Sequence, residues 1–342
     1  MAIAEQPEDW TEPGAHPVRP GVYRIPLPLH DSGLRAVNSY LVDSPSGPVL
    51  VDAGWASSRT EKALSQALRP LGYRLDDVRE VLVTHCHWDH LTQALVLREA
   101  FGSRVRLGRG EQPSIDGFER ELGLYPRQVE LLRRCGASEL AARIDTLPVS
   151  DEERSMPHER PDLWMDDGEL LALDGRELQV IATPGHTRGH VVLRDAAAGL
   201  LFAGDHVLPG ITPSLGLEPV PGAKPLRSYL DSLRLVRDLP DALLLPAHGP
   251  VTPSVHVRVD ELLEHHRVRL QEALDAVAAG AETPYQVALA LPWTRRASRL
   301  EELDLFSRML AVLETDAHLD LLADRGILVA GEEDGVLRYS PA

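Results

Sequence analysis

Apolar residues along most of the chain fall into short runs that are separated by longer segments of mixed polarity. Short runs predict buried strands, and apolar residues at helical spacing predict helices that pack on them. The expected strands occupy residues 22–25, 37–42, 49–52, 78–83, 105–107, 178–182, 200–203 and 243–245. Helices are expected through about residue 68, capped by Ser57 or Ser58, and at 91–101. This alternation predicts an α/β (α+β) fold, an αβ/βα sandwich of two sheets with helices outside.

The pattern changes near residue 255, where longer helical periodicities replace the short apolar runs. Helices are expected at 259–279, 284–291 and 301–324, and a hairpin follows with strands at 327–329 and 336–339. Three helices followed by a hairpin are typical of a winged-helix module. We therefore predict three parts: a loosely ordered arm (1–20), a sandwich domain (21–255) and a winged-helix-like C-terminal domain (256–342).

Residues 110–162 form a long connection inside the predicted sandwich domain. Amphipathic helices are expected at 128–135 and 138–145, and prolines interrupt the rest of the segment. A connection of this length either covers a functional site as a lid or packs outside the sandwich, and both alternatives stay open. If it forms a lid, the candidate wall residues are Tyr125, Met156, His158 and Trp164.

Composition and charge narrow the functional classes. With 43% hydrophobic residues among 342, the chain can bury a large core. Its net charge of −17 disfavours nucleic acid as a partner, because an acidic surface repels phosphate. No apolar run is long enough for a membrane span. The two cysteines give no disulfide framework, and residues 1–20 lack a signal-peptide pattern, so we expect a cytoplasmic protein.

Potential metal ligands gather directly after predicted strands. His85, His87, Asp89 and His90 follow the run at 78–83 within a single short segment. In an extended segment alternate side chains point the same way, so the first two histidines can face one point while Cys86 turns away. Three further ligand-type residues also follow apolar runs: His186, Asp205 and His248. Imidazole and carboxylate together suit zinc or another borderline first-row metal.

These motifs together resemble the metallo-β-lactamase superfamily over about residues 20–255, which implies that the sandwich is a catalytic domain. The resemblance implies a first metal site of His85, His87 and His186, a second of Asp89, His90 and His248, and Asp205 as the bridging carboxylate. An Asp-His pair instead of a cysteine ligand is more similar to the hydroxyacylglutathione hydrolase (glyoxalase II) side of the superfamily. Two residues are expected to contact the ligands from behind: Asp52 and His206.

The resemblance implies a dinuclear metal-dependent hydrolase with two divalent ions, zinc first, with iron or manganese as alternatives. Metal-bound hydroxide would attack a carboxylic thioester or ester of a small or acyl-carrier-linked substrate, with Asp89 and Asp205 in catalytic roles. Two cations, Lys224 and Arg227, could hold an acidic substrate group, although surface salt bridges are the simpler interpretation. The wall residues for the substrate would be Tyr125 and Trp164.

Four alternatives stay open. The winged-helix-like tail is similar to that of lactamase-like endoribonucleases, so a metal-dependent endoribonuclease or phosphodiesterase is one. Its third helix opposes this reading, because it carries seven acidic residues against a single Arg308. The same ligands would also serve a lactonase, a di-iron redox protein or a non-catalytic protein that binds metal or senses a ligand. We expect the tail to frame the site or to form a homodimer contact.

Overall fold

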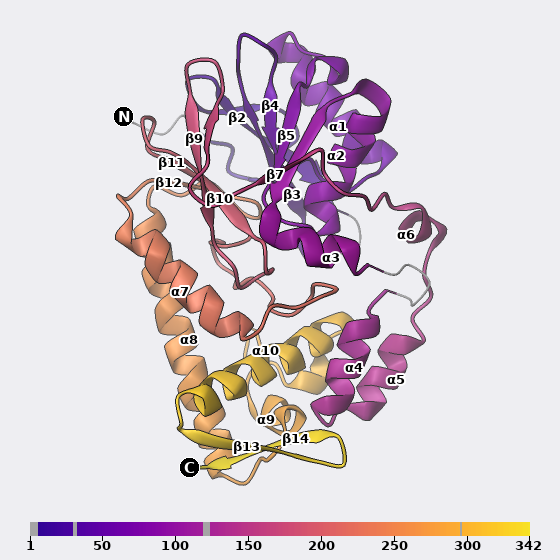
Figure 1. The fold of residues 1–342 in the computed structure, drawn as a ribbon, viewed down its shortest axis with the longest axis vertical. Coiled ribbons are helices and arrows are strands. Elements are labelled where there is room, and N and C mark those ends of the chain that lie inside the picture. Colours follow the sequence, from indigo (N-terminus) through magenta and orange to yellow (C-terminus); the bar gives the residue numbers. More distant parts are fainter. Residues whose placement is uncertain (1–5, 30–32, 119–123, 295) are drawn as a thin grey trace.

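The computed structural model describes residues 6–29, 33–118, 124–294 and 296–342. Two mixed sheets face each other and form the upper part of the molecule in Figure 1, with helices on both outer sides. The predicted αβ/βα sandwich is therefore confirmed. None of the helices in these ranges has the length and apolar character needed to cross a membrane.

The first sheet has seven strands that lie in sequence order. Its first half is antiparallel, and its last four strands run parallel to each other. The carboxyl ends of these parallel strands meet at one edge, so the loops that follow them lie together. The strands are β1 (His16–Arg19), β2 (Val22–Pro28), β3 (Ala36–Val42), β4 (Val49–Val51), β5 (Glu80–Val83), β6 (Arg104–Gly108) and β7 (Leu163–Met165).

The second sheet has five strands in the order β12-β11-β10-β9-β8. Only the β11–β12 pair is parallel, and the other neighbours are antiparallel. Its strands are β8 (Leu170–Ala172), β9 (Glu177–Ala182), β10 (Val191–Asp195), β11 (Leu200–Gly204) and β12 (Leu243–Pro246). Buried apolar residues of both sheets form one cluster between them, including Val51, Leu82, Phe202 and Leu245.

Helices cover the outer face of each sheet. A second apolar cluster joins the first sheet to α1 (Ser58–Leu68) and α2 (Trp88–Phe101). Ser57 caps α1, because its side chain accepts a hydrogen bond from the Thr60 N–H, as the sequence predicted. The short 3₁₀ helices are η1 (Arg69–Leu71), η2 (Leu75–Asp77), η3 (Arg109–Glu111) and η5 (Leu300–Glu302).

The outer face of the second sheet shares one continuous apolar cluster with the C-terminal part of the chain. That cluster includes residues of α7 (Pro225–Asp238), α8 (Val255–Ala278), α9 (Pro284–Ala290) and α10 (Leu305–Asp324). The hairpin of β13 (Leu328–Glu333) and β14 (Val336–Pro341) turns at Asp334 and Gly335, which both have positive φ. The assignment of these elements as a winged helix remains a prediction.

Several boundaries differ from the sequence-based expectation. The last long helix begins at Leu305 instead of residue 301, because the Asp304 side chain accepts the Ser307 N–H as an N-cap. The sequence analysis did not predict β7, β8, β10 or α7. Within the expected arm, β1 pairs with β2, and buried Arg24 binds the Gln6 side chain at 3.2 Å.

The long connection also has a definite place in the fold. It contains α3 (Gln112–Asp116), α4 (Pro126–Arg134), α5 (Ser138–Asp145) and α6 (Asp151–Ser155), while residues 119–123 lie outside the described ranges. Helices α4 and α5 pack against α10, and their apolar residues join the cluster of the C-terminal helices. In Figure 1 they lie below the sandwich, beside α10. This part of the connection, α4 and α5, is therefore built into the C-terminal region.

Candidate metal centre

Three histidines and an aspartate from distant parts of the chain converge at one end of the sandwich. His85 and His87 follow β5, His186 follows β9, and Asp205 follows β11. His186 Nε2 lies 3.3 Å from His85 Nε2, 3.0 Å from His87 Nδ1 and 3.4 Å from Asp205 Oδ2. His85 Nε2 and His87 Nδ1 are 3.0 Å apart. These four side chains form the first ligand group.

Asp89, His90 and His248 form a second ligand group beside the first. Asp89 and His90 lie in the first turn of α2, and His248 follows β12. The Asp89 Oδ2 atom is 3.4 Å from His248 Nε2 and 3.7 Å from His90 Nε2. Asp205 Oδ1 lies 3.4 Å and 3.7 Å from the same two nitrogens. Asp205 therefore presents one carboxylate oxygen to each group, which is the geometry of a bridging ligand.

The spacing and the chemistry of these atoms fit two divalent ions. Ligand atoms at about 2.0–2.2 Å from a tetrahedral ion lie about 3.3–3.6 Å from one another. The separations here are 3.0–3.7 Å. Among the described residues, His90 Nε2, His248 Nε2 and Asp205 Oδ1 are buried without a hydrogen-bond partner. Bound cations would relieve the free-energy cost of burying these atoms unpaired.

The surroundings shift the pKa values of the ligand-type histidines in opposite directions. Burial lowers the pKa of His87 and of His186 to about 3, so both imidazoles are neutral and keep a lone pair. His90 differs, because burial opposes its charge but nearby carboxylates outweigh that effect and raise its pKa to about 10. Positive charge at the His90 position is therefore favoured by three nearby carboxylates, those of Asp89, Asp52 and Asp205.

Hydrogen bonds from behind hold the ligand histidines in place. Asp52 Oδ2 lies 2.9 Å from His90 Nδ1, and its other oxygen accepts the Thr84 N–H at 2.8 Å. Asp52 thus contacts a ligand from behind, where the sequence analysis expected it. His186 Nδ1 donates to the Ser214 carbonyl at 2.7 Å, and His248 Nδ1 donates to the Ala36 carbonyl at 2.8 Å. A carbonyl only accepts, so each Nε2 keeps its lone pair for a metal ion.

His190 is a supporting residue that the sequence analysis missed. It is fully buried, and its Nε2 accepts the backbone N–H of Asp205 at 3.1 Å. Its Nδ1 then carries the proton and donates to Thr183 Oγ1 at 2.9 Å. Gly204 is needed beside it, because a Cβ there would lie 2.6 Å from His190 Nε2 and its φ is +49°. The available signal was a second histidine four residues after His186.

A tight backbone contact positions the His186 loop against α7. Gly185 has a φ of +144°, and a Cβ at this position would lie 2.4 Å from the Tyr229 Cα. The Tyr229 hydroxyl donates to the carbonyl of His206 at 3.0 Å. His206 itself is buried, with its ring 6.0 Å from that of His190 and 5.4 Å from that of Tyr229. His206 therefore contacts the residues that frame the centre.

Asp89 is the more exposed of the two carboxylates among the ligand-type residues of the centre. The Asp89 side chain is 18% exposed, whereas those of His90, His186, Asp205 and His248 are at most 8% exposed. Trp88, which precedes Asp89 in the chain, belongs to a row of half-buried rings whose neighbouring centroids lie 5.4, 6.3 and 4.0 Å apart. The row consists of the rings of Trp55, Trp88, Phe118 and His158. Among these four residues, only His158 was predicted from the sequence as a wall residue.

The other predicted substrate residues lie outside the two ligand groups. Tyr125 stacks on Phe306 of α10 with ring centroids 5.7 Å apart, and Trp164 packs on the core under the first sheet. Met156 is buried. Lys224 Nζ lies 3.2 Å from an oxygen of Asp324, and Arg227 binds Asp324 at 2.5 Å. The two cations thus pair with α10, as the simpler interpretation of the sequence expected.

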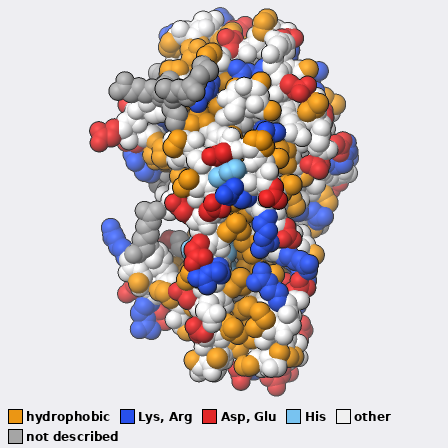
Figure 2. All heavy atoms as spheres, turned by 90° about the vertical axis from the view of Figure 1, so that its left-hand side faces the viewer, with side chains coloured by type: hydrophobic (Ala, Val, Ile, Leu, Met, Phe, Trp, Pro, Cys, Tyr) orange, Lys and Arg blue, Asp and Glu red, His pale blue; other side chains and the backbone are white. Residues whose placement is uncertain are grey.

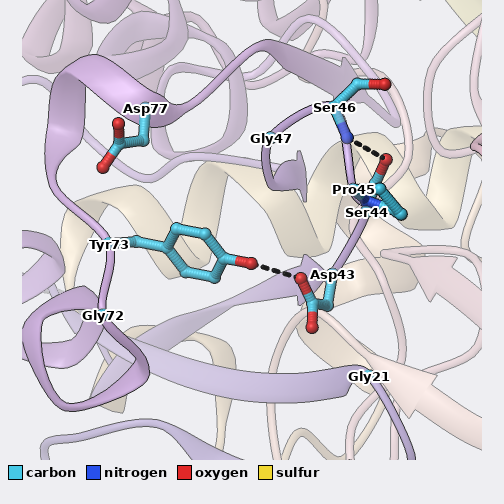
Figure 3. Close-up of a pocket in the computed structure, with 9 residues that line it drawn as sticks. All are labelled: Gly21, Asp43, Ser44, Pro45, Ser46, Gly47, Gly72, Tyr73 and Asp77. Carbon is cyan, nitrogen blue, oxygen red and sulfur yellow. Dashed lines mark hydrogen bonds between the residues drawn. The ribbon is translucent and has the colours of Figure 1, made fainter.

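Two cavities accompany the sandwich. One of about 220 Å³ adjoins the His186 loop and is lined by Gly110, Arg188, Glu218 and Gly222 among others. The other, of about 630 Å³, lies between loops that precede β4 and β5, so it is at the opposite strand ends from the metal ligands. Figure 3 shows the Tyr73 hydroxyl directed at Asp43 in this hollow. Its polar lining is separate from the metal centre.

Comparisons with known proteins agree with this geometry. Residues 32–248 match the family described as the metallo-beta-lactamase superfamily. The chain is 27% identical to the probable metallo-hydrolase YqjP of Bacillus subtilis, covering 87% of this chain and 90% of that protein. It is 26% identical to the hydroxyacylglutathione hydrolase GloC of Haemophilus influenzae, over 63% of this chain and 85% of that one. The crystal structure of a metallo-beta-lactamase family protein from Thermus thermophilus superimposes with a TM-score of 0.79 and 29% identity, covering 95% of this chain and 99% of the other.

Proposed function

The chain belongs to the metallo-beta-lactamase superfamily, and on that premise we propose that it is a dinuclear zinc hydrolase of carboxylic thioesters or esters. Members of this superfamily are mostly metal-dependent hydrolases. The observation that carries the proposal is the position of Asp205, which directs one oxygen to each of two ligand groups. Ligands of nitrogen and oxygen in this arrangement suit zinc first, with iron or manganese as alternatives.

Two divalent ions bound here would activate a water molecule at neutral pH and polarise a carbonyl of the substrate. The chain's own residues set the direction of approach. Asp89 is the ligand carboxylate that remains partly exposed, so it can accept a hydrogen bond from a water molecule on the open side. Asp52, Ala36 and Ser214 hold the ligand rings from behind and so limit their movement during turnover.

Three features favour a thioester or ester with an apolar acyl group. The match to a hydroxyacylglutathione hydrolase supports thioester chemistry. The row of rings from Trp55 to His158 includes Trp88, which precedes Asp89 in the chain, and it could pack against an acyl chain or an aromatic acyl group. Attack by metal-bound water would require no serine or cysteine nucleophile. Cys86 is a poor nucleophile, because it is buried and burial raises the pKa of its thiol.

A phosphodiester substrate is disfavoured by charge. Nucleic acid requires a continuous basic surface. On the face shown in Figure 2, acidic and basic side chains are interspersed. Lys224 and Arg227 are both engaged by acidic residues of α10, because Lys224 pairs with Asp320 and Asp324 and Arg227 pairs with Asp324. We therefore place RNA after thioesters in the order of substrates to test. Lactones, to which this charge argument does not apply, also follow thioesters in that order.

The direct test is thiol release from a panel of acyl thioesters of glutathione, coenzyme A and an acyl carrier protein. Each carrier should be tested with an acetyl group and with a bulky aromatic acyl group, using zinc-loaded protein. We expect turnover that His85→Ala abolishes and that His16→Ala, a histidine far from both ligand groups, leaves unchanged. Absence of release above the His85→Ala background, with two bound ions demonstrated by metal analysis, would overturn the thioester proposal.

A further inference from the structure

A third group of potential metal ligands lies away from the dinuclear centre. It consists of His265 and His266 on α8 and Glu314 on α10, and we call these three residues the α8–α10 cluster. One ligand atom from each lies within 4.8 Å of the others. Figure 1 shows α7, α8 and α10 side by side, and all three helices contact one another. The cluster therefore sits where the C-terminal helices meet the helix that braces the His186 loop.

The cluster is separated from the dinuclear centre by three intervening rings, those of Tyr229, His206 and His190. The Tyr229 ring contacts His206 on one side and His266 on the other, with centroid distances of 5.4 and 5.5 Å. His206 in turn lies beside His190, which supports Asp205. None of the seven residues of the dinuclear centre belongs to the cluster. Any ion held there would be an additional one.

A chain of hydrogen bonds orients His266 as a ligand. The Nδ1 atom of His318 lies 2.7 Å from the backbone carbonyl of Glu314, which can only accept, so this nitrogen carries the proton. With this single proton on the ring, the Nε2 atom of His318 is an acceptor. That Nε2 lies 3.1 Å from His266 Nδ1, which must therefore donate. The remaining nitrogen of His266, Nε2, keeps a lone pair.

This lone pair is buried and unmatched. The His266 side chain is 1% exposed, and its Nε2 has no hydrogen-bond partner among the described residues. Leaving a buried acceptor without a partner costs on the order of 1–3 kcal/mol. Metal-binding histidines usually present one nitrogen to the ion and donate the other to a neighbouring acceptor. His266 has this arrangement, with His318 as the acceptor.

The Glu314 carboxylate of the cluster also lacks a positively charged partner in direct contact among the described residues. Glu314 is half-buried, and it forms no salt bridge with the other described residues. Arg269 acts on it through space, but its guanidinium pairs with Glu272 at 2.9 Å and lies over the Trp293 ring. His265 is exposed, so an ion could reach the cluster from solvent and both outer side chains can adjust toward it. A divalent cation would balance the carboxylate.

We propose that His265, His266 and Glu314 form a third metal site, for zinc or a similar borderline divalent ion, that ties α8 to α10. Two imidazoles and one carboxylate are a common zinc donor set, and water from the exposed side would complete it. The ion would fasten the C-terminal helices to each other next to Tyr229. It would thereby stabilise the region on which the His186 loop rests.

The test is metal stoichiometry of the full-length protein after loading with excess zinc and dialysis. We expect three zinc ions per chain for the wild type and two for Glu314→Gln and for His265→Ala. His265 is exposed, so its replacement leaves the core intact. Glu264→Gln, an exposed carboxylate on the same helix, serves as the matched control and should keep three. Two ions in the wild type, or three in both cluster variants, would overturn the proposal.

A second measurement tests the orientation of His266. His318→Phe keeps a ring of similar size but removes the acceptor of His266 Nδ1. We expect zinc to bind the third site about 10–100-fold more weakly in a competition titration with a chelator. Unchanged affinity would show that the ion does not use the oriented His266 and would overturn this site. Because stoichiometry and affinity need no substrate, these results are independent of the proposed thioester hydrolysis.

Discussion

The candidate metal centre at the strand ends and the α8–α10 cluster use similar side chains on different structural supports. The ligands of the centre follow strands β5, β9, β11 and β12, and backbone carbonyls of Ala36 and Ser214 fix two of its rings. The cluster takes its ligands from two helices, and one further histidine fixes one of its rings. The register of a sheet brings strand ends together, whereas helix faces meet only through tertiary packing.

The two regions also differ in burial. Five of the seven residues of the centre are buried, whereas the cluster contains exposed His265 and half-buried Glu314. When an ion binds, a buried site whose ligands are already held by hydrogen bonds has a smaller free-energy cost of ordering those ligands. We therefore expect the centre to bind metal more tightly than the cluster, and the following changes test that difference.

The largest effect is expected from Asp205→Ala. This change removes the carboxylate that faces both ligand groups, so activity should fall by more than about 100-fold, beyond the effect of losing a supporting contact. Metal analysis should show loss of ions from the centre, while the α8–α10 cluster keeps its own. A variant that retains both ions of the centre would contradict the bridging role of Asp205.

Asp52→Asn should weaken zinc binding at the second ligand group by about 10–100-fold. Asp52 has a φ of +56°, which Asn tolerates, so the backbone turn should survive. The amide has only one acceptor oxygen for the three donor groups that Asp52 now satisfies, which are the His90 Nδ1–H, the Thr84 N–H and the Thr84 hydroxyl. Chelator titration measures the affinity, and equal affinity in variant and wild type would exclude this supporting role.

Gly185→Ala should lower the free energy of unfolding by about 1–3 kcal/mol. The new Cβ would meet the Tyr229 backbone, so the His186 loop or α7 must shift. Thermal unfolding measures this change. Gly331→Ala is the control, because its Cβ would meet nothing within 4 Å and its φ is not positive. Equal unfolding temperatures for the two variants would show that the loop is less tightly packed against α7 than the structure indicates.

The smallest effect concerns Asp316 on α10. Burial, followed by the charge of Asp320, raises the pKa of Asp316 from 3.8 to about 6. The folded state thus binds a proton more readily than the unfolded state. Its contribution to stability is present below pH 4 and is lost as the pH rises through 6. Asp316→Asn should therefore be more stable than the wild type at pH 8 by about 1–2 kcal/mol, with no gain at pH 4. A pH-independent difference would reject this assignment.

Much of the sandwich could be predicted because its buried strands are short apolar runs. The missed strands β7 and β8 have only three residues each and expose Leu163 and Leu170, so they lack that pattern. Helix α7 was missed although Pro225 begins it and apolar residues recur at helical spacing along it. The start of α10 was misplaced because an acidic N-cap resembles the acidic residues of a helix surface.

The seven ligand-type residues could be named before the fold was known, because motif and position after a strand carry their chemistry. Asp205 could not be shown to face both groups, since that depends on where β11 lies between β10 and β12. The supporting His190 and the ring row from Trp55 to Phe118 were missed for a similar reason. Their roles depend on contacts with residues far away in the chain.

The sequence by itself determined the fold class, the metal ligands and the acidic character that disfavours nucleic acid. These properties depend on local periodicity, residue chemistry and net charge, which need no coordinates. Tertiary structure decided which ligand-type residues lie together, that Asp89 remains partly exposed and that His266 meets Glu314 across two helices. Such pairings arise from the packing of segments distant in the chain, and local sequence pattern does not encode that packing.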